Sequence, residues 1–187
     1  MPSDVEIASA ALHELGAAAI TAFDDDSDRA RVVKALYDAT RDATLRAHPW
    51  NFALVRKARA QDATAPLFKY AFSYTLPTDP YCLRVIRPDW TGLPEWKVEG
   101  RAFLTDAESV SILYISRVVD PERFDALFTE AFTARLASRM AIPITGIRAL
   151  MEAFYTLSIQ KIAAAQSIDG QEGTPDRAES LFLTEIR

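Results

Sequence analysis

The sequence predicts an α+β fold in which helices and strands occupy separate blocks of the chain. Apolar residues recur at helical spacing up to residue 48, and they alternate with polar residues through much of residues 50–118. Helical spacing then returns after residue 119. Blocks of one kind of element, without regular alternation of strand and helix, are typical of α+β proteins.

The first helix is predicted over residues 3–21, where apolar side chains follow a helical stripe. Ser3 and Asp4 are the candidates for its N-cap, because a short polar side chain there can accept a hydrogen bond from a free backbone N–H. An acidic stretch at residues 23–28 then interrupts the helical pattern. We therefore expect a break between two helices at this point.

The second helix is predicted to begin after Asp26 or Ser27 and to end at His48. One of its faces is mostly apolar, and charged residues such as Arg41 fill the other faces. This distribution is typical of a surface helix with one buried side.

The motif His48-Pro49-Trp50 marks the end of the helical block. Proline disfavours the α conformation in the residue before it, so the helix should stop at His48. Trp50 and Phe52 follow at the two-residue spacing of a strand face, and Trp50 is expected to anchor the junction by burying a large aromatic surface. The alternative makes His48 a general base, which requires a nucleophile and an orienting carboxylate that no local motif supplies.

The middle of the chain is predicted to be a small antiparallel sheet, arranged as a meander or a sandwich. One strand has an aromatic face, and a hairpin turns at residues 99–101. The predicted strands are residues 68–76, 81–87, 96–98, 102–104 and 109–116.

Two further helices are predicted after the strands. Asp120 is a good N-cap and Pro121 suits the first helical position, so a third helix should run from there to about residue 141. A turn containing Pro143 separates it from a fourth helix over residues 147–166. The apolar surface of this last helix is wide enough to pack on both a partner helix and a second surface.

The C-terminal segment, residues 167–187, differs sharply in composition from the rest of the chain. Residues 168–187 hold five acidic and two basic residues, so they contribute −3 of the net charge of −5. Such a segment buries too little to fold alone, and we expect a flexible tail that gains order on a partner surface. Its apolar residues, the candidates for docking on that partner, are Leu181, Phe182, Leu183 and Ile186.

These patterns together predict three parts. Residues 1–49 and 119–166 form a four-helix bundle from two N-terminal and two C-terminal helices, and residues 50–118 form an antiparallel β subdomain. Residues 167–187 form an extended C-terminal docking tail.

Composition argues against several classes of function. The net charge of −5 disfavours a protein whose main task is to bind phosphates. One local basic cluster, Arg56, Lys57 and Arg59, is either a solvated strand end or a contact for DNA or an acidic partner. One cysteine and two histidines cannot form a four-ligand Cys/His zinc site, so no metal or cofactor is expected.

Two other functions remain as alternatives. A glycoside hydrolase would use a pair of carboxylates, but the 26 acidic residues always provide some pair and so give little support. A nucleic-acid-binding accessory protein would use Arg56, Lys57 and Arg59, and its binding would depend steeply on salt.

The order of the blocks resembles the tail tubular protein A family, the head-to-tail adaptor proteins of short-tailed bacteriophages and prophages. The similarity extends collinearly from about residue 4 to residue 166. Its most specific segments are RDATLRAHPWNF, LPTDPYCLRV and VVDPERFDALFTEAFTARLA.

The resemblance implies a structural virion protein without an enzyme centre. Members of this family assemble as a twelve-fold ring beneath the portal protein, between the capsid vertex and the tail nozzle. The expected partners are therefore copies of the same chain, the portal, the nozzle, candidate tail fibres and, transiently, the DNA that leaves the head. The protein would be made in the bacterial host cytoplasm, and no membrane contact is expected.

Overall fold

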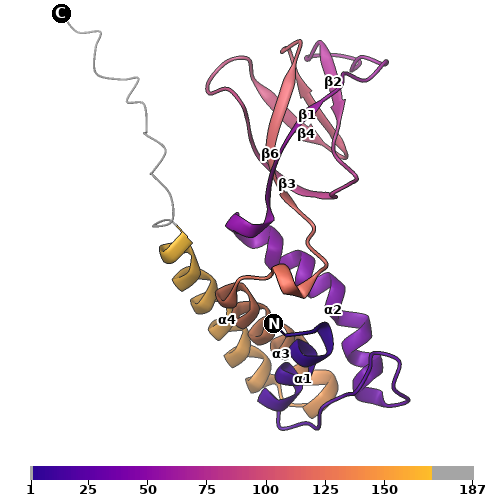
Figure 1. Cartoon of the computed structure of the whole chain (residues 1–187), viewed down its shortest axis with the longest axis vertical. Helices are drawn as coiled ribbons and strands as arrows, with labels where there is room; N and C mark the ends of the chain where they lie inside the picture. Colours follow the sequence, from indigo (N-terminus) through magenta and orange to yellow (C-terminus); the bar gives the residue numbers. More distant parts are fainter. Residues whose placement is uncertain (1, 170–187) are drawn as a thin grey trace, which may run out of the picture.

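The computed structural model describes residues 2–169 and confirms an α+β fold. These residues form four α-helices and two antiparallel sheets of three strands each. The helices lie together at one end of the molecule and the strands lie at the other (Figure 1). None of the described helices is both long enough and apolar enough to span a membrane.

Helix α3 is the centre of the helical part, because it contacts each of the other three helices. Its buried face packs Phe128 and Phe132 against Leu12 of α1 and Tyr37 of α2 in one core. The helices are α1 Asp4–Glu14, α2 Asp28–Ala47, α3 Ala126–Thr145 and α4 Arg148–Asp169.

The first two helices begin where the sequence predicts. Ser3 caps α1 in a capping box with Glu6, and Ser27, rather than Asp26, caps α2 by accepting from the N–H of Ala30. The predicted end of α1 was wrong: the helix stops at Glu14 and not at residue 21. The backbone of Gly16 takes a φ of 71°, a left-handed conformation that ends helices readily when the residue is glycine.

The start and end of α3 also differ from the prediction. Asp120 and Pro121 begin only a short 3₁₀ turn, η2 Pro121–Arg123, and Asp125 provides the N-cap of α3. Pro143 lies inside α3 and not in a turn after it. Because Pro143 lies in the last turn, the helix loses a single backbone hydrogen bond close to its end and is not broken there. Gly146, in the left-handed conformation, terminates the helix.

The strands pair antiparallel, as predicted, and they divide into two sheets, as the sandwich alternative requires and a single meander does not. The first sheet has the order β1-β6-β3 and the second has the order β2-β5-β4. Tyr74 and Phe103 of the second sheet share an apolar core with Ile112 and Tyr114 of the first. The strands are β1 Leu54–Arg59, β2 Phe72–Thr75, β3 Cys82–Pro88, β4 Trp96–Glu99, β5 Ala102–Thr105 and β6 Val110–Ser116.

Two strand predictions need correction. The aromatic strand is shorter than expected: β2 begins at Phe72, because Lys69 has a φ of 72° and interrupts the extended backbone, leaving Phe68 82% exposed. Trp50 and Phe52 do not lie on a strand face. They belong to a 3₁₀ turn, η1 Asn51–Ala53, and its N-cap, and β1 starts only at Leu54.

The predicted tail begins later than expected, because α4 continues to Asp169. The rest of the predicted docking tail lies outside the described residues. That part includes Leu181, Phe182, Leu183 and Ile186.

Candidate functional site

Trp50 is fully buried where α2 meets the β part of the chain. Its indole Nε1 donates a hydrogen bond to the backbone oxygen of Thr44 at 3.1 Å. The ring packs edge-on against Phe128 of α3, with 5.2 Å between ring centroids, and Phe52 packs on the same Phe128 ring. The junction therefore connects α2, η1 and α3 through one aromatic cluster.

His48 is the C-cap of α2 and has the extended backbone that Pro49 imposes on it, with φ −139° and ψ 147°. Its ring is buried and lies edge-on to Trp50, with 5.0 Å between centroids. This position gives His48 a packing role at the junction.

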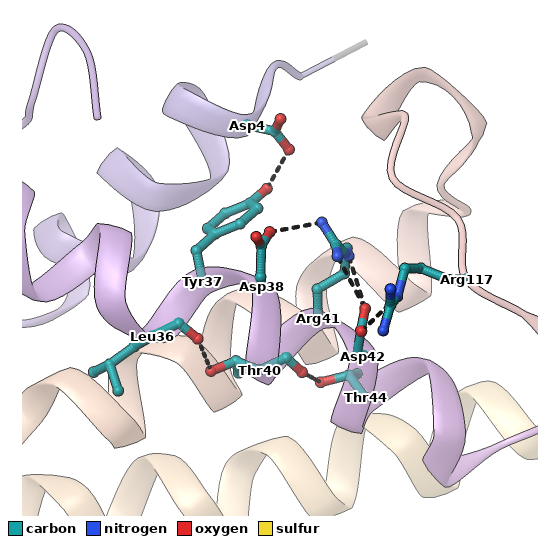
Figure 2. A network of polar contacts seen from close by, with 9 residues as sticks. All are labelled: Asp4, Leu36, Tyr37, Asp38, Thr40, Arg41, Asp42, Thr44 and Arg117. Carbon is teal, nitrogen blue, oxygen red and sulfur yellow. Dashed lines mark hydrogen bonds and ion pairs between the residues drawn. The ribbon is translucent and has the colours of Figure 1, made fainter. Parts of the chain in front are cut away.

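A polar network joins the helices to the last strand (Figure 2). Arg41 of α2 is buried, although the sequence placed it on an outer face, and it pairs with Asp38 at 2.8 Å and Asp42 at 2.9 Å. Asp42 also faces Arg117, which follows β6, at 2.7 Å. The carboxylates offset the cost of burying a guanidinium, and Asp42 links α2 to the end of β6.

The same network fixes the N-terminal helix on α2. The hydroxyl of Tyr37 donates to a carboxylate oxygen of Asp4 at 2.7 Å. Burial raises the pKa of Tyr37 far above its usual range, and the hydrogen bond to Asp4 raises it further. Tyr37 therefore stays a neutral hydrogen-bond donor between the two helices.

The basic cluster of β1 does not form a single patch. Lys57 donates to the backbone oxygen of Asp79 and Arg59 donates to that of Thr75, each at 2.7 Å. Both side chains therefore tie β1 to segments of the β part. Arg56 lies on the opposite face of the strand and is exposed, since neighbouring strand residues alternate in direction.

A second basic cluster, which is not a cluster in the sequence, lines a cavity of about 500 Å³ between the helical and β parts. We call it the arginine cavity and define it by Arg46, Arg84, Arg101 and Arg117. These residues come from α2, β3, the β4–β5 turn and the segment after β6. No local motif could reveal them, because only the tertiary fold brings them together.

Tyr81 organises part of the arginine cavity. The guanidinium carbons of Arg101 and Arg117 lie 4.1 and 4.3 Å from the centroid of its ring. Arg101 also donates to the backbone oxygens of Cys82 and Pro77, at 2.7 Å each. Two of the four guanidiniums are thus held in place by an aromatic ring and by backbone carbonyls.

Helix α4 exposes an apolar edge beside its contact with α3. Tyr155 is 53% exposed and Ile159 is 50% exposed, and their four-residue spacing places them on one face. Beside them lies a cavity of about 260 Å³ that Arg135 of α3 and Ala47 at the end of α2 also line. The end of α2, α3 and α4 thus form a groove with an apolar edge, which we call the α4 groove.

The loops of the β part form a second exposed apolar surface. Leu67, Phe68 and Leu93 are each more than four-fifths exposed. Phe68 and Leu67 border a hollow of about 380 Å³ near Leu104 of β5. We call this surface the loop patch.

The described residues contain no group of three or more histidine, cysteine or acidic side chains placed to hold a metal ion. Cys82 is buried, and burial raises the pKa of its thiol, so it is a poor nucleophile. Neither the models of known protein families nor the curated proteins include a match to this sequence.

Proposed function

We propose that this protein is a structural virion protein: the subunit of a head-to-tail adaptor ring that joins the portal to the tail nozzle and lines the DNA exit channel. The proposal starts from the collinear sequence blocks that resemble the tail tubular protein A family. The structural observation that supports it best is the α4 groove, whose apolar edge has no partner within the described part of the subunit.

Helix α4 uses only one of its faces inside the subunit. Leu150 and Phe154 pack toward the common core, and the hydroxyl of Ser138 on α3 donates to the backbone oxygen of Met151 at 2.9 Å. Tyr155 and Ile159 remain half exposed beside this contact. Contiguous exposed apolar residues of this kind typically mark an interaction surface.

A ring needs two different surfaces on each subunit, because every copy contacts one neighbour with each side. The α4 groove on the helices and the loop patch on the β part are two such surfaces, and they differ in shape and composition. In this proposal the four helices act as one bundle, and the neighbouring copies, twelve in a closed ring, cover the groove.

The charge of the chain suits a channel for DNA. A lumen with a net negative subunit charge, here −5, does not hold a translocating polyanion firmly. Contacts with the passing DNA are then transient. Tail fibres are a further candidate partner of this ring.

The C-terminal segment would provide the contact with the portal. Leu181, Phe182, Leu183 and Ile186 would dock in an apolar groove of the portal, each contributing on the order of 1.5–3 kcal/mol before ordering costs. Twelve such attachments would act together through the shared ring. A chain truncated after Ser167 would then remain folded and lose its association with the portal.

The decisive experiment measures the mass of the purified chain alone and mixed with its portal ring. Twelve chains of 20.8 kDa add about 250 kDa to the portal. Ile159→Glu should prevent the ring from forming, since it places a charge in the covered groove. Gln160→Glu, which adds the same charge on the next, exposed residue, should leave assembly intact. A chain that stays monomeric with and without the portal would contradict the proposal.

A further inference from the structure

The arginine cavity concentrates positive charge in a protein that is acidic overall. Among the residues that line it there is no carboxylate, and of its four guanidiniums Arg117 pairs with Asp42, which already pairs with Arg41. The cavity therefore has an excess of positive charge, although the whole chain has a net charge of −5. An arrangement of this kind costs folding free energy unless an anion completes it.

Several donors in the cavity have no protein acceptor. No hydrogen bond or ion pair joins the Arg84 side chain to the described part of the protein, whereas Arg46 donates to the backbone oxygen of Leu83. Arg117 Nε lies 2.7 Å from Asp42 Oδ2, but its N–H does not point at that oxygen, so Nε is buried without a hydrogen-bond acceptor. The donors of Arg84 are therefore available to a ligand, since each guanidinium has five N–H groups, whereas Arg117 Nε is itself buried beside Asp42.

The pKa of Arg84 also favours an anionic ligand in the arginine cavity. Burial lowers the pKa of Arg84, and the neighbouring charge of Arg46 lowers it further. Both effects mean that the positive charge of Arg84 destabilises the folded subunit. A side chain that lowers stability and has no protein partner is typical of a binding site.

The chemistry of the cavity selects the kind of anion. A phosphate group has up to two negative charges and three acceptor oxygens, and it matches several guanidiniums better than a single carboxylate does. The volume of about 500 Å³ exceeds that of a bare phosphate and is within the usual range for small organic ligands. The partly exposed ring of Trp96 on β4 forms one wall, against which an organic group can pack.

We propose that the arginine cavity binds a phosphate ester, with Arg46, Arg84 and Arg117 holding the phosphoryl group and Trp96 contacting the organic part. Arg101 and Tyr81 shape the cavity. The ester can come from a free nucleotide or from the backbone of a nucleic acid, because both present the same group. This site does not depend on the proposed ring. The mass measurement tests the ring and the ligand-binding measurement tests the cavity, so either proposal can fail without the other.

The test uses the full chain with four probes: inorganic pyrophosphate, adenosine 5′-monophosphate, a short single-stranded DNA, and adenosine as the probe without phosphate. Calorimetry should show binding of adenosine 5′-monophosphate or of the DNA and none of adenosine, and binding of pyrophosphate alone would contradict a site for an ester. A mononucleotide that binds as tightly as the DNA identifies a free ester as the source. DNA that binds more tightly, with a steep salt dependence, identifies a nucleic acid backbone.

Arg84→Gln should weaken that binding roughly tenfold or more and leave the unfolding temperature unchanged or higher. Arg84→Lys, which keeps the charge and loses the planar fork, should weaken it less. Arg148→Gln removes the same charge from an exposed ion pair on α4 and should have no effect. The proposal is wrong if no phosphorylated probe binds, if adenosine binds equally well, or if Arg84→Gln and Arg148→Gln behave alike.

Discussion

Replacement of Trp50 by alanine is expected to destabilise the subunit by about 3–5 kcal/mol. The side chain is fully buried, so the change opens a cavity between α2, η1 and α3. A buried tryptophan removes roughly 150–250 Å² from water, which at about 25 cal/mol per Å² gives a similar magnitude. The backbone oxygen of Thr44 also loses the donor that lies 3.1 Å away.

Urea unfolding followed by far-ultraviolet circular dichroism measures this change. Trp50→Phe is the matched control, because it keeps most of the aromatic packing while it removes the hydrogen bond and part of the ring volume, with an expected cost of about 1–3 kcal/mol. His48→Ala should leave any assembly function intact, since His48 contributes packing at the edge of the same cluster. The architectural role of the junction would be refuted if Trp50→Ala lowered the free energy of unfolding by less than about 1 kcal/mol. It would also be refuted if the His48→Ala protein folded and assembled but had lost its function.

Three further changes test other parts of the structure. Asp42→Asn should destabilise the protein by about 1–3 kcal/mol, because it leaves the buried Arg41 with Asp38 as its remaining ion-pair partner. Urea unfolding measures this change, and an unchanged midpoint of the unfolding curve would contradict the role of Asp42. Burial alone would raise the pKa of Asp62, but hydrogen bonds, first that from Ser73, lower it below its ordinary value. The stability that the Asp62 carboxylate contributes at neutral pH should therefore be lost as the pH falls below about 4. Asp62→Asn should make this acid-dependent loss of stability smaller, and an unchanged pH dependence of unfolding would contradict the role of Asp62. Cys82 should react slowly with a thiol reagent in the native protein and rapidly in denaturant, and fast native labelling would show that this thiol is not buried as described.

Local sequence signals were sufficient for much of the fold. Helical and alternating periods distinguish the helical blocks from the strands, and Ser3 and Ser27 mark helix starts because capping depends on neighbouring backbone groups alone. The extended backbone of His48 follows from Pro49 by local steric exclusion. For the same reason the turn at Gly100 between β4 and β5 could be predicted from its own few residues.

Other features depend on contacts that the local pattern does not contain. The end of α1 and the start of α3 were missed because several residues could terminate or cap a helix, and packing decides which one does. The exposed appearance of Arg41 in the helical pattern gave no sign that two carboxylates would let it be buried. Division of the strands into two sheets likewise depends on which strands meet across the core.

The two basic clusters show most clearly the difference between what the sequence predicts and what the tertiary structure decides. The sequence pointed to Arg56, Lys57 and Arg59 because they are neighbours in the chain, but Lys57 and Arg59 use their charges to bind backbone oxygens within the β part. The arginine cavity draws its residues from four separate segments between Arg46 and Arg117. The sequence by itself determined the order of the helical and strand blocks, since these follow from short-range propensity and periodicity. Only the tertiary structure decided where charges converge, because electrostatic interaction depends on distance in space and not on separation along the chain.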